Sequence, residues 1–64
     1  MNRELEKNIA SKVLNYKLKI LQKNNGLPKK SENDLLFEFY TYLLKFSIEK
    51  LSDIPAKYDP IIKS

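Results

Sequence analysis

The chain has no cysteine and no histidine among its 64 residues, and it holds a single glycine. Without cysteine there is no disulfide and no thiolate ligand, and without histidine the commonest general base and metal ligand is missing. One glycine is too few for the phosphate-binding loops of nucleotide-binding proteins. We therefore expect a protein that is not an enzyme and that uses no metal, no other cofactor and no small-molecule substrate.

The length allows one domain, 1–64, and a chain of this size buries only about 60% of the surface that its unfolded form exposes. Small domains without disulfides depend on close helix packing or on oligomerisation. The first residues are polar, so we expect no secretory signal. Apolar runs also fall well short of the roughly 20 residues of a membrane span. These features predict a cytoplasmic protein.

Residues 2–24 have the periodicity of an amphipathic helix. The first apolar stripe recurs at intervals of four, four, three and four: Leu5, Ile9, Val13, Tyr16 and Ile20. A second apolar stripe, expected on an adjacent face, is formed by Leu14, Leu18 and Leu21. The run Asn24, Asn25, Gly26 and Pro28 then favours a helix end, so we predict a loop over 25–31.

A second helix is predicted over about 32–52, with Ser31 at its N-cap and Asp34 three residues later. Its polar residues fall on one narrow strip: Asp34, Glu38, Thr41, Lys45, Glu49 and Ser52. The rest of its circumference is largely apolar. A strand over 37–44 is disfavoured because the alternation of apolar and polar residues fails at Phe39–Tyr40 and at Leu43–Leu44.

One neighbouring helix covers an apolar stripe of only about 100°, so this second helix needs more than one neighbour. One predicted buried face holds Phe37, Tyr40, Leu44, Ile48 and Leu51. The other holds Leu35, Phe39, Tyr42, Leu43 and Phe46. We expect one face to meet the first helix and the other to meet a further protein surface, and the sequence does not say which is which.

The C-terminal tail, 53–64, holds two prolines and four larger apolar residues: Ile54, Tyr58, Ile61 and Ile62. We expect these side chains to fold back over the second helix, although a peptide that docks on another protein is the alternative. The predicted fold is all-α: an antiparallel two-helix hairpin with a short C-terminal segment. Homodimerisation would complete it as a four-helix bundle.

The apolar surplus and the missing catalytic groups predict a small protein-interaction module, such as an adaptor, an inhibitor or a regulatory subunit. Its partner would be a second copy or a different protein. The predicted interface residues are Leu14, Leu18, Leu21, Leu35, Phe39, Tyr42, Leu43 and Phe46.

Nucleic-acid binding is the alternative function, because the net charge of +4 is unevenly distributed. Residues 1–30 hold eight basic and two acidic residues, whereas residues 31–64 hold four basic and six acidic ones. The residues predicted to contact phosphates and bases are Lys12, Asn15, Lys19, Lys23, Lys29 and Lys30. A membrane-surface role is disfavoured because the apolar side of the first helix carries no Trp or Phe. The abundance of Lys, Asn and Ile is typical of AT-rich bacterial or phage genomes.

Overall fold

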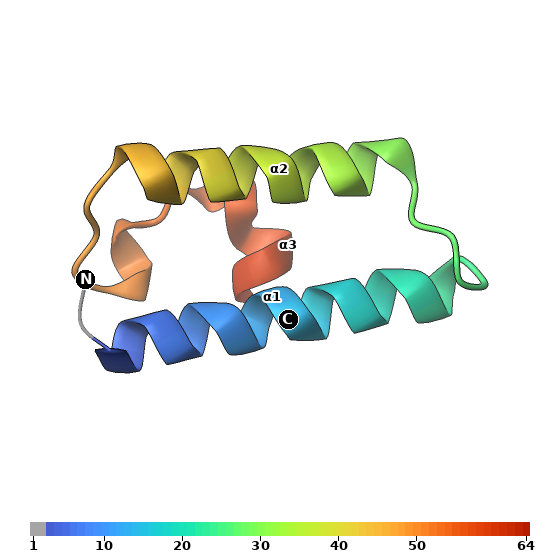
Figure 1. The fold of residues 1–64 in the computed structure, drawn as a ribbon, viewed down its shortest axis with the longest axis horizontal. Coiled ribbons are helices and arrows are strands. Elements are labelled where there is room, and N and C mark those ends of the chain that lie inside the picture. The colour runs from blue at the N-terminus through green and yellow to red at the C-terminus, as the bar shows by residue number, and fades with distance from the viewer. Residues whose placement is uncertain (1–2) are drawn as a thin grey trace.

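The computed structural model describes residues 3–64, and the predicted all-α class is confirmed for them, since they contain helices and no strand. The two long helices are α1, Arg3–Lys23, and α2, Lys30–Lys45. The remaining elements are two 3-10 turns, η1 (Leu51–Asp53) and η2 (Ala56–Tyr58), and the single-turn helix α3 (Asp59–Ile62). Figure 1 shows α1 and α2 running in opposite directions, with the C-terminal segment between and behind them.

The first apolar stripe of α1 forms one wall of the core. All five of its side chains are at most 9% exposed: Leu5, Ile9, Val13, Tyr16 and Ile20. The second stripe is different, because Leu14, Leu18 and Leu21 are 58%, 50% and 37% exposed. With 3.6 residues per turn, this stripe lies roughly 145° from the buried one. The stripe therefore lies toward solvent and not next to the buried one, so the expectation of an adjacent face is wrong.

The end of α1 is built by residues in the left-handed backbone region. Asn25 has φ +55° and Gly26 has φ +91°. The Gly26 N–H donates to the Leu21 carbonyl oxygen at 2.7 Å, and the Asn24 N–H donates to Ile20 at 3.1 Å. This is the pattern in which a residue beyond a helix satisfies carbonyl groups that the last turn leaves without partners. It ends α1 one residue before the expected position.

Glu32 joins the loop to the start of α2. The N-cap is Lys29 and not the expected Ser31, because the Lys29 backbone N–H donates to Glu32 Oε1 at 2.9 Å. The same oxygen accepts a hydrogen bond of 2.6 Å from Asn24 Nδ2. The Lys29 hydrogen bond, the Asn24 hydrogen bond and the charges of Lys23 and Lys29 lower the pKa of Glu32 despite an opposing effect of desolvation. Glu32 therefore ties the end of α1 to the start of α2 as a carboxylate.

The second helix ends at Lys45, seven residues before the predicted end at 52, so Ile48 and Leu51 do not belong to its buried face. Phe46 is already extended, with φ −125° and ψ +134°. Asp53 Oδ2 accepts hydrogen bonds from the backbone N–H groups of Glu49, at 3.2 Å, and Lys50, at 3.3 Å. These two hydrogen bonds satisfy backbone N–H groups that are not part of a helix. The chain can therefore turn back and bury Ile48, which is 2% exposed.

The C-terminal segment completes the core. Its side chain Ile61 and the α2 side chain Phe39 are the two that are fully buried, each at 0% exposure. Tyr58 lies beside Phe39, with ring centroids 5.3 Å apart, and beside Tyr42 at 5.6 Å. Helix α1 lies closer to α3 than to α2. The second neighbour that α2 requires is thus supplied, on one side, by the chain's own tail.

Replacing Phe39 by alanine tests this core. Truncation of a buried Phe costs about 3–5 kcal/mol, which is close to the whole folding free energy that a domain of this size reaches. Phe37 is the matched control, because it lies on the same helix and is 73% exposed. Phe37→Ala should change the free energy of unfolding by about 0.5 kcal/mol or less. Urea denaturation followed by circular dichroism measures both, and equal losses in the two variants would refute this core.

Glu32→Gln tests the junction between α1 and α2. A carboxylate whose pKa is lowered by folding contributes stability above its unfolded pKa, and that contribution disappears as the pH falls through the folded value. The wild type should therefore melt at a higher temperature than Glu32→Gln at pH 7. The difference should shrink steadily as the pH falls below about 4.3, the ordinary glutamate value. A gap in melting temperature that stays constant down to pH 2 would contradict the role of the carboxylate charge.

Candidate protein-interaction surface

Large apolar side chains remain exposed on both long helices and in the loops. Their exposed fractions range from 37% to 88%: Leu14, Leu18, Leu21, Leu27, Phe37, Tyr40, Leu44 and Phe46. The most exposed helical ones are Leu44, at 88%, and Phe37, at 73%. Single exposed apolar residues are common, but grouped ones mark interaction sites. Their grouping therefore decides whether they form a site.

Three of them form one stripe on α2. Phe37, Tyr40 and Leu44 are separated by three and four residues, so they share one side of the helix. Tyr42 faces the C-terminal segment, because its ring lies 5.6 Å from that of Tyr58. Tyr40 precedes Tyr42 by two residues and so lies roughly 200° around the helix from it. Tyr40 and Leu44 are therefore turned away from the C-terminal segment, whereas Phe37 lies at the edge of a second pocket that Tyr42 and Tyr58 also line.

The predicted division of α2 into faces is thus corrected. Phe39, which was predicted to contact a partner, is fully buried inside the chain. Leu35, Tyr42 and Leu43, from the same predicted face, pack against the core and are half-buried. Of that face only Phe46 is largely exposed, at 55%. The exposed face is instead the one that carries Phe37, Tyr40 and Leu44, because the C-terminal segment packs against the side with Phe39 and Tyr42.

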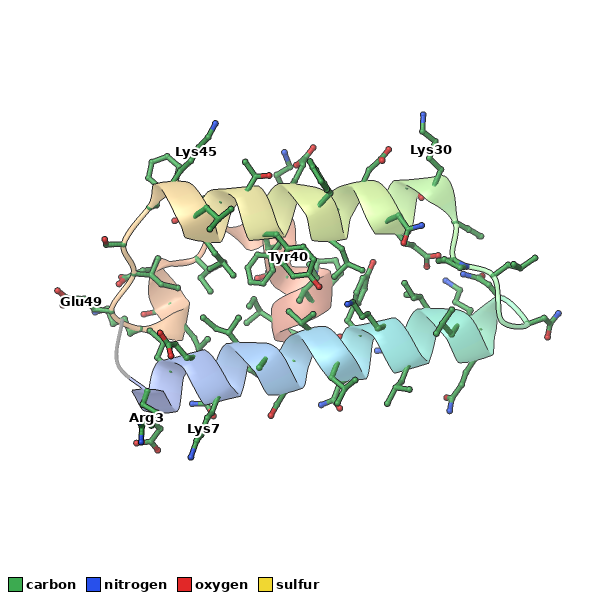
Figure 2. The ribbon with its side chains drawn as sticks, viewed as in Figure 1. Arg3, Lys7, Lys30, Tyr40, Lys45 and Glu49 are labelled. Atoms are coloured by element: carbon green, nitrogen blue, oxygen red, sulfur yellow. The ribbon has the colours of Figure 1, made fainter. Side chains whose placement is uncertain are left out.

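A groove runs between α1 and α2 on this free side. Its lining residues come from three turns of α1 and one turn of α2: Glu6, Ile9, Ala10, Val13, Leu14, Lys17, Tyr40 and Leu43. Buried Ile9 and Val13 form its floor, and the exposed Ala10 leaves room for a side chain from outside. Figure 2 shows Tyr40 between the two helices, in front of the C-terminal segment. The groove is apolar along its length and can accept a row of apolar side chains.

The charged residues of the groove stand toward its two ends. Lys17 Nζ lies 5.6 Å from the centre of the Tyr40 ring, which is a cation–π distance. Glu6 is eleven residues earlier on α1, or roughly 16 Å along the helix axis. The groove therefore has a positive end and a negative end. We call the surface formed by Ala10, Leu14, Phe37, Tyr40 and Leu44 the open face.

A smaller apolar surface lies at the end of α2. The Tyr42 and Phe46 rings stack with centroids 4.8 Å apart and an interplanar angle of 27°. Next to them, Lys57 of the C-terminal segment forms an ion pair with Glu38 of α2, and the hydrogen bond and charge of Glu38 raise the pKa of Lys57. This pair holds the segment against the polar strip of α2. The stack is thus part of the packing of the tail, with one ring edge open to solvent.

The residues of the nucleic-acid alternative are distributed over two helices. Lys12 is half-buried, and the other five are exposed: Asn15, Lys19, Lys23, Lys29 and Lys30. Lys12, Lys19 and Lys23 follow one side of α1, at intervals of seven and four residues. Figure 2 shows Lys30 on α2 pointing away from α1. The negative charge of Glu32 also lies close to Lys23 and Lys29. The six residues do not gather on a single surface.

In comparisons with protein-family models, curated proteins and solved structures, this chain matches none of them. Within residues 3–64, no helix has the length and apolar content that crossing a membrane requires. The same residues contain no group of three or more acidic side chains placed to hold a metal ion.

The structure adds residues that the sequence did not single out. Ala10 and Lys17 line the groove, but a small residue and a lysine carry no signal of their own in an amphipathic pattern. Tyr40 and Leu44 were assigned to a buried face. The apolar residues of the tail indicated that one side of α2 would be covered. The side is decided by contacts between distant residues, such as Tyr58 with Phe39 and Tyr42.

Proposed function

We propose that this protein is a small protein-interaction module, an adaptor, inhibitor or regulatory subunit, that binds through the open face. The observation that carries the proposal is the exposure of Leu44 (88%) and Phe37 (73%) on the same side of α2 as Tyr40, which lines an apolar groove. The chain's own tail covers the other side of the helix pair and leaves this side without a cover. A partner helix or loop that presents apolar side chains would fill the groove.

The energetics of such a contact are favourable. Full burial of an exposed Leu or Phe contributes about 1.5–3 kcal/mol. The three side chains of the α2 stripe are 88%, 73% and 38% exposed, so their burial would contribute roughly 3–6 kcal/mol in total. Association costs about 4–15 kcal/mol in lost freedom of motion. The α1 side of the open face, with Leu14 at 58% exposure, is therefore needed as well. We propose that a partner covers both helices, as two further helices would in a four-helix bundle.

The mechanism is occlusion or bridging. A rigid helix pair that inserts a Tyr and a Leu into a partner's apolar surface blocks that surface to other proteins. Rigid placement matters, because ordering a loop on binding would reduce the affinity. The complete burial of Phe39 and Ile61 holds the helices and the tail together before any partner arrives.

Photo-crosslinking in the native host cells tests this function. A photoreactive amino acid at position 44 should give a covalent adduct with a protein, because Leu44 lies on the open face. The matched control is position 45, where Lys45 points away from α1 (Figure 2). Position 45 should give at most about a tenth of the adduct, since its polar side remains solvated in the complex.

An absence of any adduct from position 44, or equal adducts from both positions, would overturn the proposed function. The mass of the adduct also identifies the class of partner. Twice the mass of this chain indicates a second copy, and any other mass indicates a different protein.

The alternative, nucleic-acid binding, is supported by the spacing of Lys12, Lys19 and Lys23 along one side of α1. It makes a separate prediction about salt. If these lysines neutralise three phosphates of duplex DNA, the logarithm of the binding constant should fall with the logarithm of salt concentration with a slope of about −2.7. Fluorescence anisotropy with a labelled duplex measures this slope. Removal of Lys19 and Lys23 together should reduce it to about −0.9, and no binding at 20 mM salt excludes this alternative.

A further inference from the structure

The lining of the groove is symmetric about its midpoint. On α1 the lining residues form pairs at equal distances on either side of a point between residues 11 and 12: Ala10 with Val13, Ile9 with Leu14, and Glu6 with Lys17. On α2 the two lining residues, Tyr40 and Leu43, flank a point between residues 41 and 42 in the same way. Each apolar lining residue is thus paired with another apolar residue across the midpoint. The one charged pair, Glu6 with Lys17, joins opposite charges.

A two-fold axis that lies in the plane of the open face and crosses both helices at these midpoints would use this symmetry. Such an axis places α1 of one protomer antiparallel on α1 of its partner, and α2 antiparallel on α2. Apolar lining then meets apolar lining. Glu6 of each protomer faces Lys17 of the partner subunit, so that the opposite charges meet twice in one dimer. This is the self-complementarity that an interface between identical chains requires.

We infer that the open face binds a second copy of this chain in this antiparallel two-fold arrangement, with Glu6 paired to Lys17 of the partner subunit. The inference rests on the proposed function and specifies its partner. The two grooves are complementary in charge, because the groove is negative at one end and positive at the other and a reversed copy of it has the opposite order. The small Ala10 near the axis allows the two α1 backbones to approach within the ordinary 8–10 Å of packed helices.

A parallel arrangement of two copies is less complementary. An axis along the helices would place α1 of each protomer over α2 of its partner. The groove receives only Tyr40 and Leu43 from α2, so Lys17 would then face no lining carboxylate. Both charges would be covered by apolar surface, which costs free energy when an ion is not paired. The antiparallel arrangement avoids this cost.

Charge reversal tests the pairing. Glu6→Lys and Lys17→Glu each bring like charges together at two places in the dimer, whereas the double variant restores opposite charges at both. An exposed pair contributes about 0.2–1 kcal/mol, so each single variant should raise the dimer dissociation constant about tenfold, equivalent to about 1.4 kcal/mol. The double variant should return to within about threefold of the wild type. Sedimentation equilibrium at low salt measures all four constants.

Lys7→Glu is the matched control for Lys17→Glu, because it makes the same change on the same helix. Figure 2 shows Lys7 pointing away from α2 and from the groove. It should leave the dissociation constant within about twofold of the wild type. Far-UV circular dichroism of each variant checks that the helices are retained.

Three outcomes overturn the inference. They are a wild-type chain that stays monomeric up to millimolar concentration, single variants that dimerise as tightly as the wild type, and a double variant no better than the singles. None of them removes the proposed function, which is tested separately by crosslinking from position 44. An adduct with a different protein, together with a monomeric purified chain, would retain the interaction module and reject the second copy. No adduct of any kind would reject both.

Discussion

The structure depends on the insertion of the C-terminal segment between the two long helices. Ile61 and Phe39 are completely buried there, and Tyr58 packs on the Phe39 ring. A chain of 64 residues can form only a small core, and the tail contributes Ile54, Tyr58 and Ile61 to it. Because α1 contacts α3 more closely than it contacts α2, the tail acts as the third element of a three-part core and is more than a cover for a finished hairpin.

This insertion also creates the exposed surface. A helix such as α2, apolar around most of its circumference, needs neighbours on more than one side. The tail covers the side that carries Phe39 and Tyr42. Within residues 3–64, the side that carries Phe37, Tyr40 and Leu44 stays exposed. The insertion that covers one side of α2 thus also defines the open face.

Charged side chains make three contacts between the elements of this arrangement. Glu32 joins the α1–α2 loop through two hydrogen bonds to one oxygen. Lys57 and Glu38 hold the tail to the polar strip of α2. Lys17 lies over the Tyr40 ring at the groove. All three contacts connect separate elements of the chain, and the third also leaves a cation at the edge of a surface that a partner can reach.

The sequence by itself determined the helical class, the buried stripe of α1 from Leu5 to Ile20 and the stop at Asn24–Gly26, because these follow from local periodicity and from backbone preferences of single residues. It indicated the wrong N-cap, Ser31, because the actual N-cap, Lys29, uses no side chain of its own. The Glu32 carboxylate accepts from its backbone N–H instead. The early end of α2 at Lys45 was decided by the tertiary structure, since Asp53 and the burial of Ile48 stabilise a turn that no local pattern requires. The same holds for the open face: periodicity shows that α2 has two apolar sides, but only the long-range contact of Tyr58 with Phe39 decides which side is covered and which stays in water.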